Sequence, residues 1–313
     1  MSEITATIIQ RSKCGVSGKE IVTWELVYPR MIHAELLTHR MFSRNSASSR
    51  AIPISKVVEM VRSDMAVPSH WGANQPGMQA KEELDGFALL GVMDLWCDAA
   101  LAAANFSEGM AALGAHKQVA NRITEPFQWM KVVLTYTEGN NWYWLRDHTD
   151  ADPTIHALAQ KMVESLEASS PFVIYPGEWH VPYVTRMRDA GGIRYLTDTY
   201  IADDEFEVQY LTEEEALAVS SSCCAQVSYR TLDLSLSKAK MIYGRLVDSE
   251  PVHASPFEHQ ATPMKYARVC KDVLHQGWQE GITHMDREGM FWSGNFQGMI
   301  QHRQLIPNNV KKG

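Results

Sequence analysis

The chain has 313 residues, of which 45% are hydrophobic and 21% are charged. This composition is typical of a soluble globular protein and too apolar for a disordered one. Lys and Arg together number 29 and Asp and Glu 37, so the formal net charge is −8. An acidic balance argues against general nucleic-acid binding, which usually requires a basic excess.

The order of residues excludes further classes of protein. We expect no apolar run to approach the roughly 18–20 residues of a membrane span, and the N-terminus lacks the features of a secretion signal. The sequence therefore predicts a cytoplasmic protein with no membrane partner and no nucleic-acid partner. The five cysteines are scattered without a CxxC pair, which argues against a disulfide framework or a cysteine zinc site.

The hydrophobic pattern predicts two strands, residues 3–10 and 20–28, followed by a helix from Pro29 to Phe42. Ordered loop structure is expected over residues 171–185, and a mixture of helix and loop over the last forty residues. Further helices are expected over 52–65, 80–113, 116–136, 154–168, 212–229 and 236–248. The predicted fold class is α+β, with one helix-rich domain over residues 1–313 around a small mixed or antiparallel sheet.

A local excess of positive charge interrupts the acidic chain. Residues 36–58 contain no Asp or Glu, but they contain Arg40, Arg44, Arg50 and Lys56 beside several Ser and Asn side chains. Arginine forks and hydroxyl groups are the groups that bind phosphate, so an anionic small molecule is one interpretation. A solvated basic loop with Ser and Asn turns is an equally compatible interpretation of the composition.

The spacing within this segment resembles the signature of the flavin-dependent thymidylate synthases, R-H-R-x-x-S-x-N-E-x-S-x-R. The residues that match in register are His39, Arg40, Ser43, Asn45, Ser48 and Arg50. Thr38 replaces the first Arg of the signature, and Ser46 replaces the Glu. The preceding residues 23–40 are similar to the aromatic strand, proline and helix that lead into the signature in the family.

Other segments also resemble elements of this family. Arg122 within ANRITEP resembles the A-R-I-x-L-P helix start, and Asn141–Arg146 resembles N-x-x-x-L-R. Taken alone, the second segment is more simply explained as an amphipathic helix with a surface Arg. CAQVSYR (224–230) and HASPFEHQ (253–260) resemble A-R-V-S-Y and G-H-x-S-P-F-E-H, which precede the signature in ordinary members. The chain therefore resembles a rearranged or circularly permuted, phage-like member, in which residues 1–60, 80–170 and 210–313 hold successive parts of the fold.

The resemblance implies a homotetramer with FAD bound between subunits, reduced by NADPH, and methylenetetrahydrofolate as the carbon donor. The cofactor-binding residues it implies are Thr38, His39, Arg40, Asn45, Ser46 and Asn141. The residues implied to bind a pyrimidine deoxynucleotide are Glu35, Ser48, Ser49, Arg50, Arg122 and Arg146. Arg146, which would polarise the pyrimidine, and His259, a candidate proton shuttle, are the implied catalytic residues.

The implied reaction is the conversion of dUMP to dTMP. A dCMP or dUMP methylase or hydroxymethylase of the same family, acting in the host cytoplasm on phage DNA precursors, remains open. A non-catalytic flavin- or nucleotide-binding homologue is an alternative of a different class. A metal-dependent hydrolase is a further alternative, but His253 and His259 lack a third ligand at zinc spacing, so no metal site is predicted.

Two details complete the predictions. Cys223 and Cys224 lie in a predicted helix without a basic neighbour, so buried packing is favoured over thiol chemistry. Asn295 and Arg303 belong to a segment rich in Gly, aromatic and polar residues, where either a site role or a structural role is compatible with the pattern.

Overall fold

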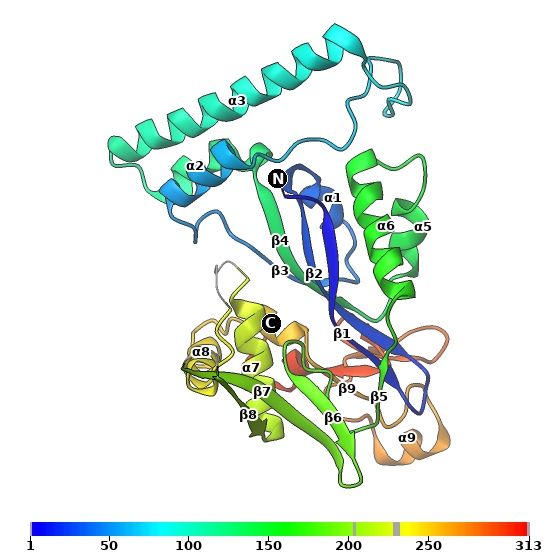
Figure 1. Cartoon of the computed structure of the whole chain (residues 1–313). Helices are drawn as coiled ribbons and strands as arrows, with labels where there is room; N and C mark the ends of the chain where they lie inside the picture. Colours follow the sequence, from blue (N-terminus) through cyan, green and yellow to red (C-terminus); the bar gives the residue numbers. More distant parts are fainter. Residues whose placement is uncertain (1, 203–204, 228–231, 312–313) are drawn as a thin grey trace.

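The computed structural model describes residues 2–202, 205–227 and 232–311. Helices and several small sheets alternate along the chain, so the predicted α+β class is confirmed. Figure 1 shows the largest sheet at the centre, with α5 and α6 beside it, the C-terminal half below it and α3 standing off at the top.

The largest sheet has the strand order β3-β4-β2-β1-β5 and is antiparallel except for the pairing of β1 with β5. Its strands are β1 (Thr5–Cys14), β2 (Glu20–Pro29), β3 (Ser43–Ser46), β4 (Trp129–Tyr136) and β5 (Phe172–Ile174). One face is apolar, and Trp24 and Leu134 on that face form a buried core with Trp142 and Leu158. The last two residues belong to α5 (Asn140–Arg146) and α6 (Pro153–Glu167), which cover this face.

The segments between β2 and β4 are mainly helical. They comprise η1 (Arg30–Ile32), α1 (His33–Leu36), α2 (Ile54–Ser63), α3 (Gly86–Ala112), α4 (Lys117–Ala120) and η2 (Asn121–Phe127), where η denotes a 3-10 helix. Val58 and Val61 of α2 pack against Ala100 and Ala104 of α3 in a separate small core. This core joins α3 to the rest of the chain along one narrow stripe.

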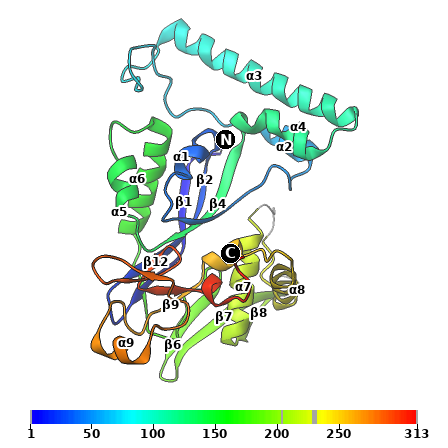
Figure 2. The same cartoon turned by 180° about the vertical axis from the view of Figure 1, so that it is seen from behind.

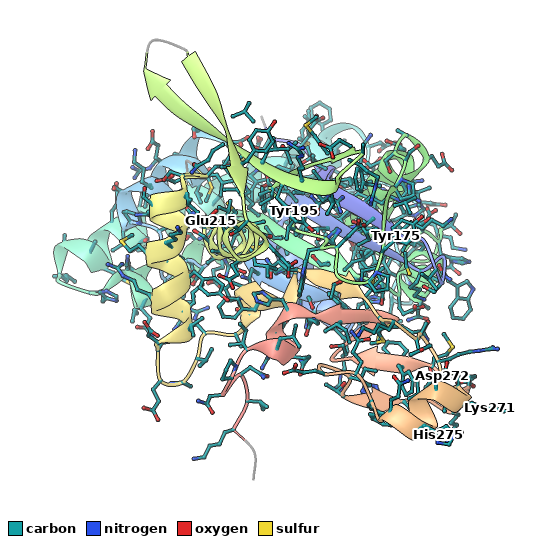
Figure 3. All side chains as sticks on the ribbon, turned by 90° about the horizontal axis from the view of Figure 1, so that it is seen from below. Tyr175, Tyr195, Glu215, Lys271, Asp272 and His275 are labelled. Atoms are coloured by element: carbon teal, nitrogen blue, oxygen red, sulfur yellow. The ribbon has the colours of Figure 1, made fainter. Side chains whose placement is uncertain are left out.

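The C-terminal half contains a three-stranded antiparallel sheet and several shorter elements. The sheet consists of β6 (Thr185–Asp189), β7 (Gly192–Ala202) and β8 (Glu205–Leu211). The helices are α7 (Glu213–Ala225), α8 (Leu236–Val247), η3 (Ser255–Glu258), α9 (Lys271–Gln276) and η4 (His302–Leu305). The short strands are β9 (Ala261–Pro263), β10 (His284–Met285), β11 (Phe291–Ser293), β12 (Phe296–Gln297) and β13 (Met299–Gln301). Figure 3 shows α9, with Lys271 and His275, at the opposite edge of this half from Glu215 of α7.

Three sequence predictions of secondary structure are wrong. The helix expected over 116–136 is α4, then η2, then the central strand β4, because the β-branched run in this apolar segment suits a buried strand and Pro126 interrupts a helix. The helix expected from Pro29 to Phe42 ends at Leu36, and Arg44 donates to the carbonyl oxygens of His39 and Phe42 in the loop that replaces it. The strands β6 to β8 were not expected, nor were the short strands of the last forty residues.

The expectation that no apolar run is long enough for a membrane span is also wrong. Helix α3 meets the length and composition of a span, with a mean hydropathy of 1.6 over an 18-residue window, of which 11% is buried. Its exposed apolar side chains include Phe87, Leu90, Leu95 and Phe106. Figure 2 shows α3 from behind, with α2 and α4 beneath one end of it. Most of its apolar surface therefore has no partner among the described residues.

Candidate functional site

The first group of predicted site residues is formed by α1, the loop after it and the end of α5. Arg146 donates from Nε to Nε2 of His39 at 3.1 Å and from a terminal nitrogen to Glu35 at 3.2 Å. The His39 ring is 8% exposed and lies edge-on to Trp142, with 4.9 Å between ring centroids. It also stacks on Phe42 at 5.7 Å. We refer to Glu35, His39 and Arg146 as the Arg146 cluster.

The charge state of His39 follows from these contacts. Burial lowers the pKa of His39, and the nearby guanidinium groups of Arg146 and Arg44 lower this pKa further. An arginine side chain can only donate hydrogen bonds, so Nε2 of His39 must accept from Arg146. His39 is therefore neutral at pH 7 and carries its proton on Nδ1.

A cavity of about 850 Å³ opens beside the Arg146 cluster. Glu35 and Arg146 line it together with His70, residues 78–81 and residues 149–153. Pockets of roughly 300–1,000 Å³ hold small molecules, so this volume suits a mononucleotide. The charged groups of the lining are the cations of Arg146 and Lys81 and the carboxylates of Glu35, Asp150 and Asp152.

The second group surrounds Glu125, which the sequence analysis missed. Its Oε1 accepts from Ser49 at 2.7 Å, from Arg30 at 2.9 Å and from Arg122 at 3.0 Å. Arg122 lies three residues before Glu125 on a helical segment, and this spacing was the available sequence signal for the ion pair. We refer to these four residues as the Glu125 cluster.

The Glu125 cluster brings the predicted phosphate-binding loop against η2. The side-chain amide of Asn121 donates to the carbonyl oxygens of Ser49 and Ile52 and so holds the loop in place. Ser48 accepts from the backbone N–H of Arg50, whose side chain is exposed. Arg50 and Arg122, which are 72 positions apart, are thereby held on neighbouring segments.

The remaining candidates for cofactor binding have different environments. Thr38, Arg40 and Asn141 are exposed, the first two in the loop after α1 and the third in the first turn of α5. Ser46 is half-buried at the end of β3. Asn45 donates from Nδ2 to the carbonyl oxygen of Cys224 at 3.0 Å, which ties β3 to α7. The structure thus assigns Asn45 a structural contact that the sequence did not suggest.

The second face of the largest sheet carries a buried row of polar side chains. Gln10, Thr23, Thr135 and Ser43 stand opposite one another on β1, β2, β4 and β3. We refer to these four residues as the polar row. Each of them forms a hydrogen bond with the C-terminal half. Gln10 bonds the backbone of residues 181 and 184, and Thr23 bonds His180. Thr135 bonds His259, and Ser43 bonds Asn295. The polar row therefore fixes how the C-terminal half lies on the sheet.

His259 is completely buried beside the polar row. Its Nδ1 lies 2.8 Å from the hydroxyl of Thr135, and its Nε2 has no hydrogen-bond partner among the described residues. Burial lowers the pKa of His259 to about 3, so the imidazole is neutral at pH 7. No hydrogen bond joins His259 to the Arg146 cluster within the described part of the chain, so the two predicted catalytic residues occupy different environments.

Cysteine and metal chemistry were tested separately. Cys223 and Cys224 are buried in α7, as expected, and burial raises the pKa of Cys223 to about 12. Over residues 2–202, 205–227 and 232–311, no group of three or more His, Cys, Asp or Glu is placed to hold a metal ion. Residues 228–230, the last three of the CAQVSYR segment, lie outside the described residues.

Comparisons with known proteins leave the family open. No family model matches the sequence, and no curated protein matches it. Solved structures with a related arrangement include the UMP/dUMP methylase PolB from Streptomyces cacaoi bound with 5-Br UMP. It has 15% identity and a TM-score of 0.43, over 54% of this chain and 90% of that chain. The same methylase bound with 5-Br dUMP has 13% identity and a TM-score of 0.44, over 54% and 91%. A likeness this weak identifies neither a family nor an activity.

Proposed function

We propose that this chain is a flavin-dependent enzyme that transfers a one-carbon group from methylenetetrahydrofolate to C5 of a pyrimidine deoxynucleoside monophosphate, with dUMP as substrate and dTMP as product. The observation that carries the proposal is the Arg146 cluster. Residues from two segments that match the family motifs, 107 positions apart, make direct hydrogen bonds at the edge of a nucleotide-sized cavity. An amphipathic helix with a solvated surface Arg would not require this contact.

Arg146 supplies the electrostatic part of this chemistry. Adding a carbon at C5 of a pyrimidine places negative charge on the ring, and a fixed cation beside a ring carbonyl stabilises that charge. Glu35 and His39 hold the guanidinium in one orientation before substrate binds. A neutral His39 adds no competing positive charge, so the cationic character of the cluster belongs to Arg146.

The basic loop supplies the groups for the phosphate. Arg50 and Arg122 are exposed and lie on neighbouring segments, with the hydroxyl group of Ser48 on the same loop. The predicted phosphate contact of Ser49 is wrong for this structure, because Ser49 is buried and donates its hydroxyl proton to Glu125. Guanidinium and hydroxyl donors bind phosphate oxygens through charge-assisted hydrogen bonds. In the proposed homotetramer, these exposed groups of one copy complete the site of its neighbour.

Several residues around His39 offer groups to a flavin. Exposed Arg40 and Asn141 and the Nδ1–H of His39 are donors suited to phosphate oxygens and ring carbonyls. Thr38 already donates its hydroxyl proton to the carbonyl oxygen of Glu35, so its side chain would only accept. One side-chain N–H of Asn45 donates to Cys224, so Asn45 would contribute through its oxygen or its second N–H. Flavin supplies the redox chemistry, with NADPH as reductant, while the protein binds and orients the reactants.

Helix α3 supports the proposed assembly. Its exposed apolar residues would be covered by other copies of the chain, because an apolar face of this length is costly to leave in water. Insertion into a bilayer is less favourable, since Asp94 and Asp98 lie near the middle of the helix and would enter the hydrocarbon.

Two measurements on the purified protein test the proposed function. Absorption bands at about 375 and 450 nm are expected from bound flavin, and a colourless protein would contradict the proposal. The protein is then incubated with NADPH, labelled methylenetetrahydrofolate and either dUMP or dCMP. Labelled dTMP is the expected product. A cytosine or hydroxymethyl product would replace the dUMP reaction by the related modification, and flavin without any product would indicate a binding protein.

A further inference from the structure

A continuous chain of hydrogen bonds runs through the buried face of the sheet to His259. Arg186 of β6 donates to the hydroxyl of Ser12 at 2.7 Å, and Ser12 lies 2.6 Å from Nδ1 of His180. Nε2 of His180 lies 2.8 Å from the hydroxyl of Thr23. The chain continues from Thr23 to the hydroxyl of Thr135 at 2.7 Å and from there to Nδ1 of His259 at 2.8 Å.

The direction of this chain is determined at Arg186, because a guanidinium donates hydrogen bonds and never accepts them. Ser12 accepts from Arg186, and its own single proton then goes to Nδ1 of His180. His180 must therefore carry its proton on Nε2 and donate to Thr23. By the same rule Thr23 donates to Thr135, and Thr135 donates to Nδ1 of His259.

The opposite direction leaves more groups unsatisfied. If His180 carried its proton on Nδ1, the hydroxyl proton of Ser12 would have no acceptor among the described residues. If His180 and Thr135 both donated to the hydroxyl oxygen of Thr23, the hydroxyl proton of Thr23 would likewise have no acceptor. Within the described part of the chain, the direction from Arg186 to His259 gives all three hydroxyl protons an acceptor and leaves only Nε2–H of His259 unpaired, whereas the opposite direction leaves both the Ser12 hydroxyl proton and Nε2 of His259 unpaired.

One group remains unpaired at the end of the chain. In the favoured direction Nε2 of His259 carries a proton, and this nitrogen is buried without a partner among the described residues. A buried donor of this kind needs an acceptor such as a carbonyl oxygen or an unprotonated ring nitrogen. We propose that Arg186 acts as a positioning residue, which fixes His259 through the hydrogen-bond chain as a permanent Nε2–H donor to a ligand acceptor.

This inference rests on the proposed function only in assuming that the acceptor belongs to a ligand of the site. It changes the role of His259 from proton shuttle to hydrogen-bond donor. A shuttle would have to regain a proton through Thr135, and reversal of the chain would set Ser12 against the donating guanidinium of Arg186. The geometry therefore holds the donor in place and opposes proton transfer through it.

The tautomers of His259 and His180 can be measured directly by NMR in deuterated protein with ¹⁵N-labelled histidine, without substrate. Long-range ¹H–¹⁵N correlations distinguish protonated from unprotonated ring nitrogens, and His259→Gln and His180→Gln spectra assign the two rings. The expected result for the wild-type chain is Nε2–H in both rings. A proton on Nδ1 of His259 would overturn the inference even if no variant could be prepared.

Ser12→Ala tests whether the chain transmits the effect. It removes the link between Arg186 and His180 and is expected to give His259, four hydrogen bonds away, a mixture of tautomers. Ser12→Thr keeps the hydroxyl and should restore the single tautomer. Ser43→Ala is the matched control, because Ser43 stands opposite Thr135 in the polar row but does not hydrogen-bond the chain. An unchanged His259 in Ser12→Ala would refute the positioning role, whereas failure of the proposed function would leave the tautomers unaffected.

Discussion

Arg146 donates a hydrogen bond from Nε to Nε2 of His39 across 3.1 Å, and this contact joins the helix α5 to the loop that follows α1. The acceptor ring is held between Phe42 and Trp142, so the guanidinium has a rigid partner. Its second contact, with Glu35, lies at the edge of the cavity of about 850 Å³. The position of the cation therefore depends on packing around His39 as well as on Arg146 itself.

Replacing Arg146 should separate catalysis from cofactor binding. We expect Arg146→Ala to lower kcat/KM by about 10- to 150-fold, which corresponds to the loss of roughly 1.5–3 kcal/mol from a charge-assisted contact. Flavin content, measured by absorbance, should fall much less than turnover. Arg62→Ala is the control, because Arg62 pairs with Glu108 of α3 and does not line the cavity. Equal losses of flavin and activity would contradict the catalytic role.

Arg50 should contribute to the affinity for nucleotide. We expect Arg50→Ala to weaken binding of dUMP by about 1.5–3 kcal/mol in isothermal calorimetry, because the variant lacks the guanidinium that would make a charge-assisted hydrogen bond to the phosphate. Lys56→Ala removes a positive charge from the same basic segment, but Lys56 already pairs with Glu59 on α2 and should have little effect. Unchanged affinity in Arg50→Ala would exclude a phosphate contact.

The buried histidines should make the folded state sensitive to acid. Burial lowers the pKa of His302 to about 4, and burial together with Arg30 and Arg44 lowers that of His33 to about 4. The unfolded chain binds these protons below about pH 6.5, so the stabilisation is present above pH 6.5 and is lost as the pH falls toward 4. Each such histidine should contribute at most about 1.4 kcal/mol per pH unit to the slope of the unfolding free energy against pH.

Urea unfolding at pH 7.5, 6, 5 and 4.5 would measure this slope. His302→Phe, which keeps a ring beside Trp179, Tyr243 and Phe257, should flatten the pH dependence. His148→Gln should leave it unchanged because His148 is exposed. A stability independent of pH over this interval would show that these imidazoles are not held neutral by burial.

Helix α3 should control the assembly of the protein. We expect the wild-type chain to be a tetramer in light scattering coupled to gel filtration, and Leu95→Glu combined with Phe106→Glu to dissociate it, because buried carboxylates are strongly unfavourable. Met78→Glu, at a fully exposed loop position, is the control. A monomeric wild-type chain, or one that floats with lipid vesicles, would contradict the proposed homotetramer.

Local features of the fold were predictable where one pattern dominated. The alternation before Gly15 and after Gly18 correctly indicated β1 and β2, because period-two alternation with β-branched residues has few other solutions. The same kind of pattern failed at β4, where a continuous apolar run is compatible with a buried strand or a buried helix. Neighbouring strands decided that case, since β2 and β3 supply hydrogen-bond partners on both edges.

The candidate site was predictable in part for a similar reason. Motif spacing indicated His39 and Arg146 as site residues, and the structure brings these two into contact. Glu125 was missed because Ser49 and Arg30, which donate hydrogen bonds to its carboxylate, are distant from it in sequence. Roles in binding and catalysis assigned by the resemblance stay predictions, and the experiments above address them.

The amino-acid sequence by itself determined the acidic overall charge, the basic segment at 36–58 and the amphipathic or alternating elements, because these depend on composition and short-range spacing. Only the tertiary structure decided that Ser43 and Asn45 support the C-terminal half, and that Thr23 and Thr135 together connect His180 to His259. Ser, Thr and Asn side chains can donate or accept in many settings. Their roles are therefore selected by whichever partners the folded chain places within hydrogen-bond distance, and those partners lie up to 258 positions away.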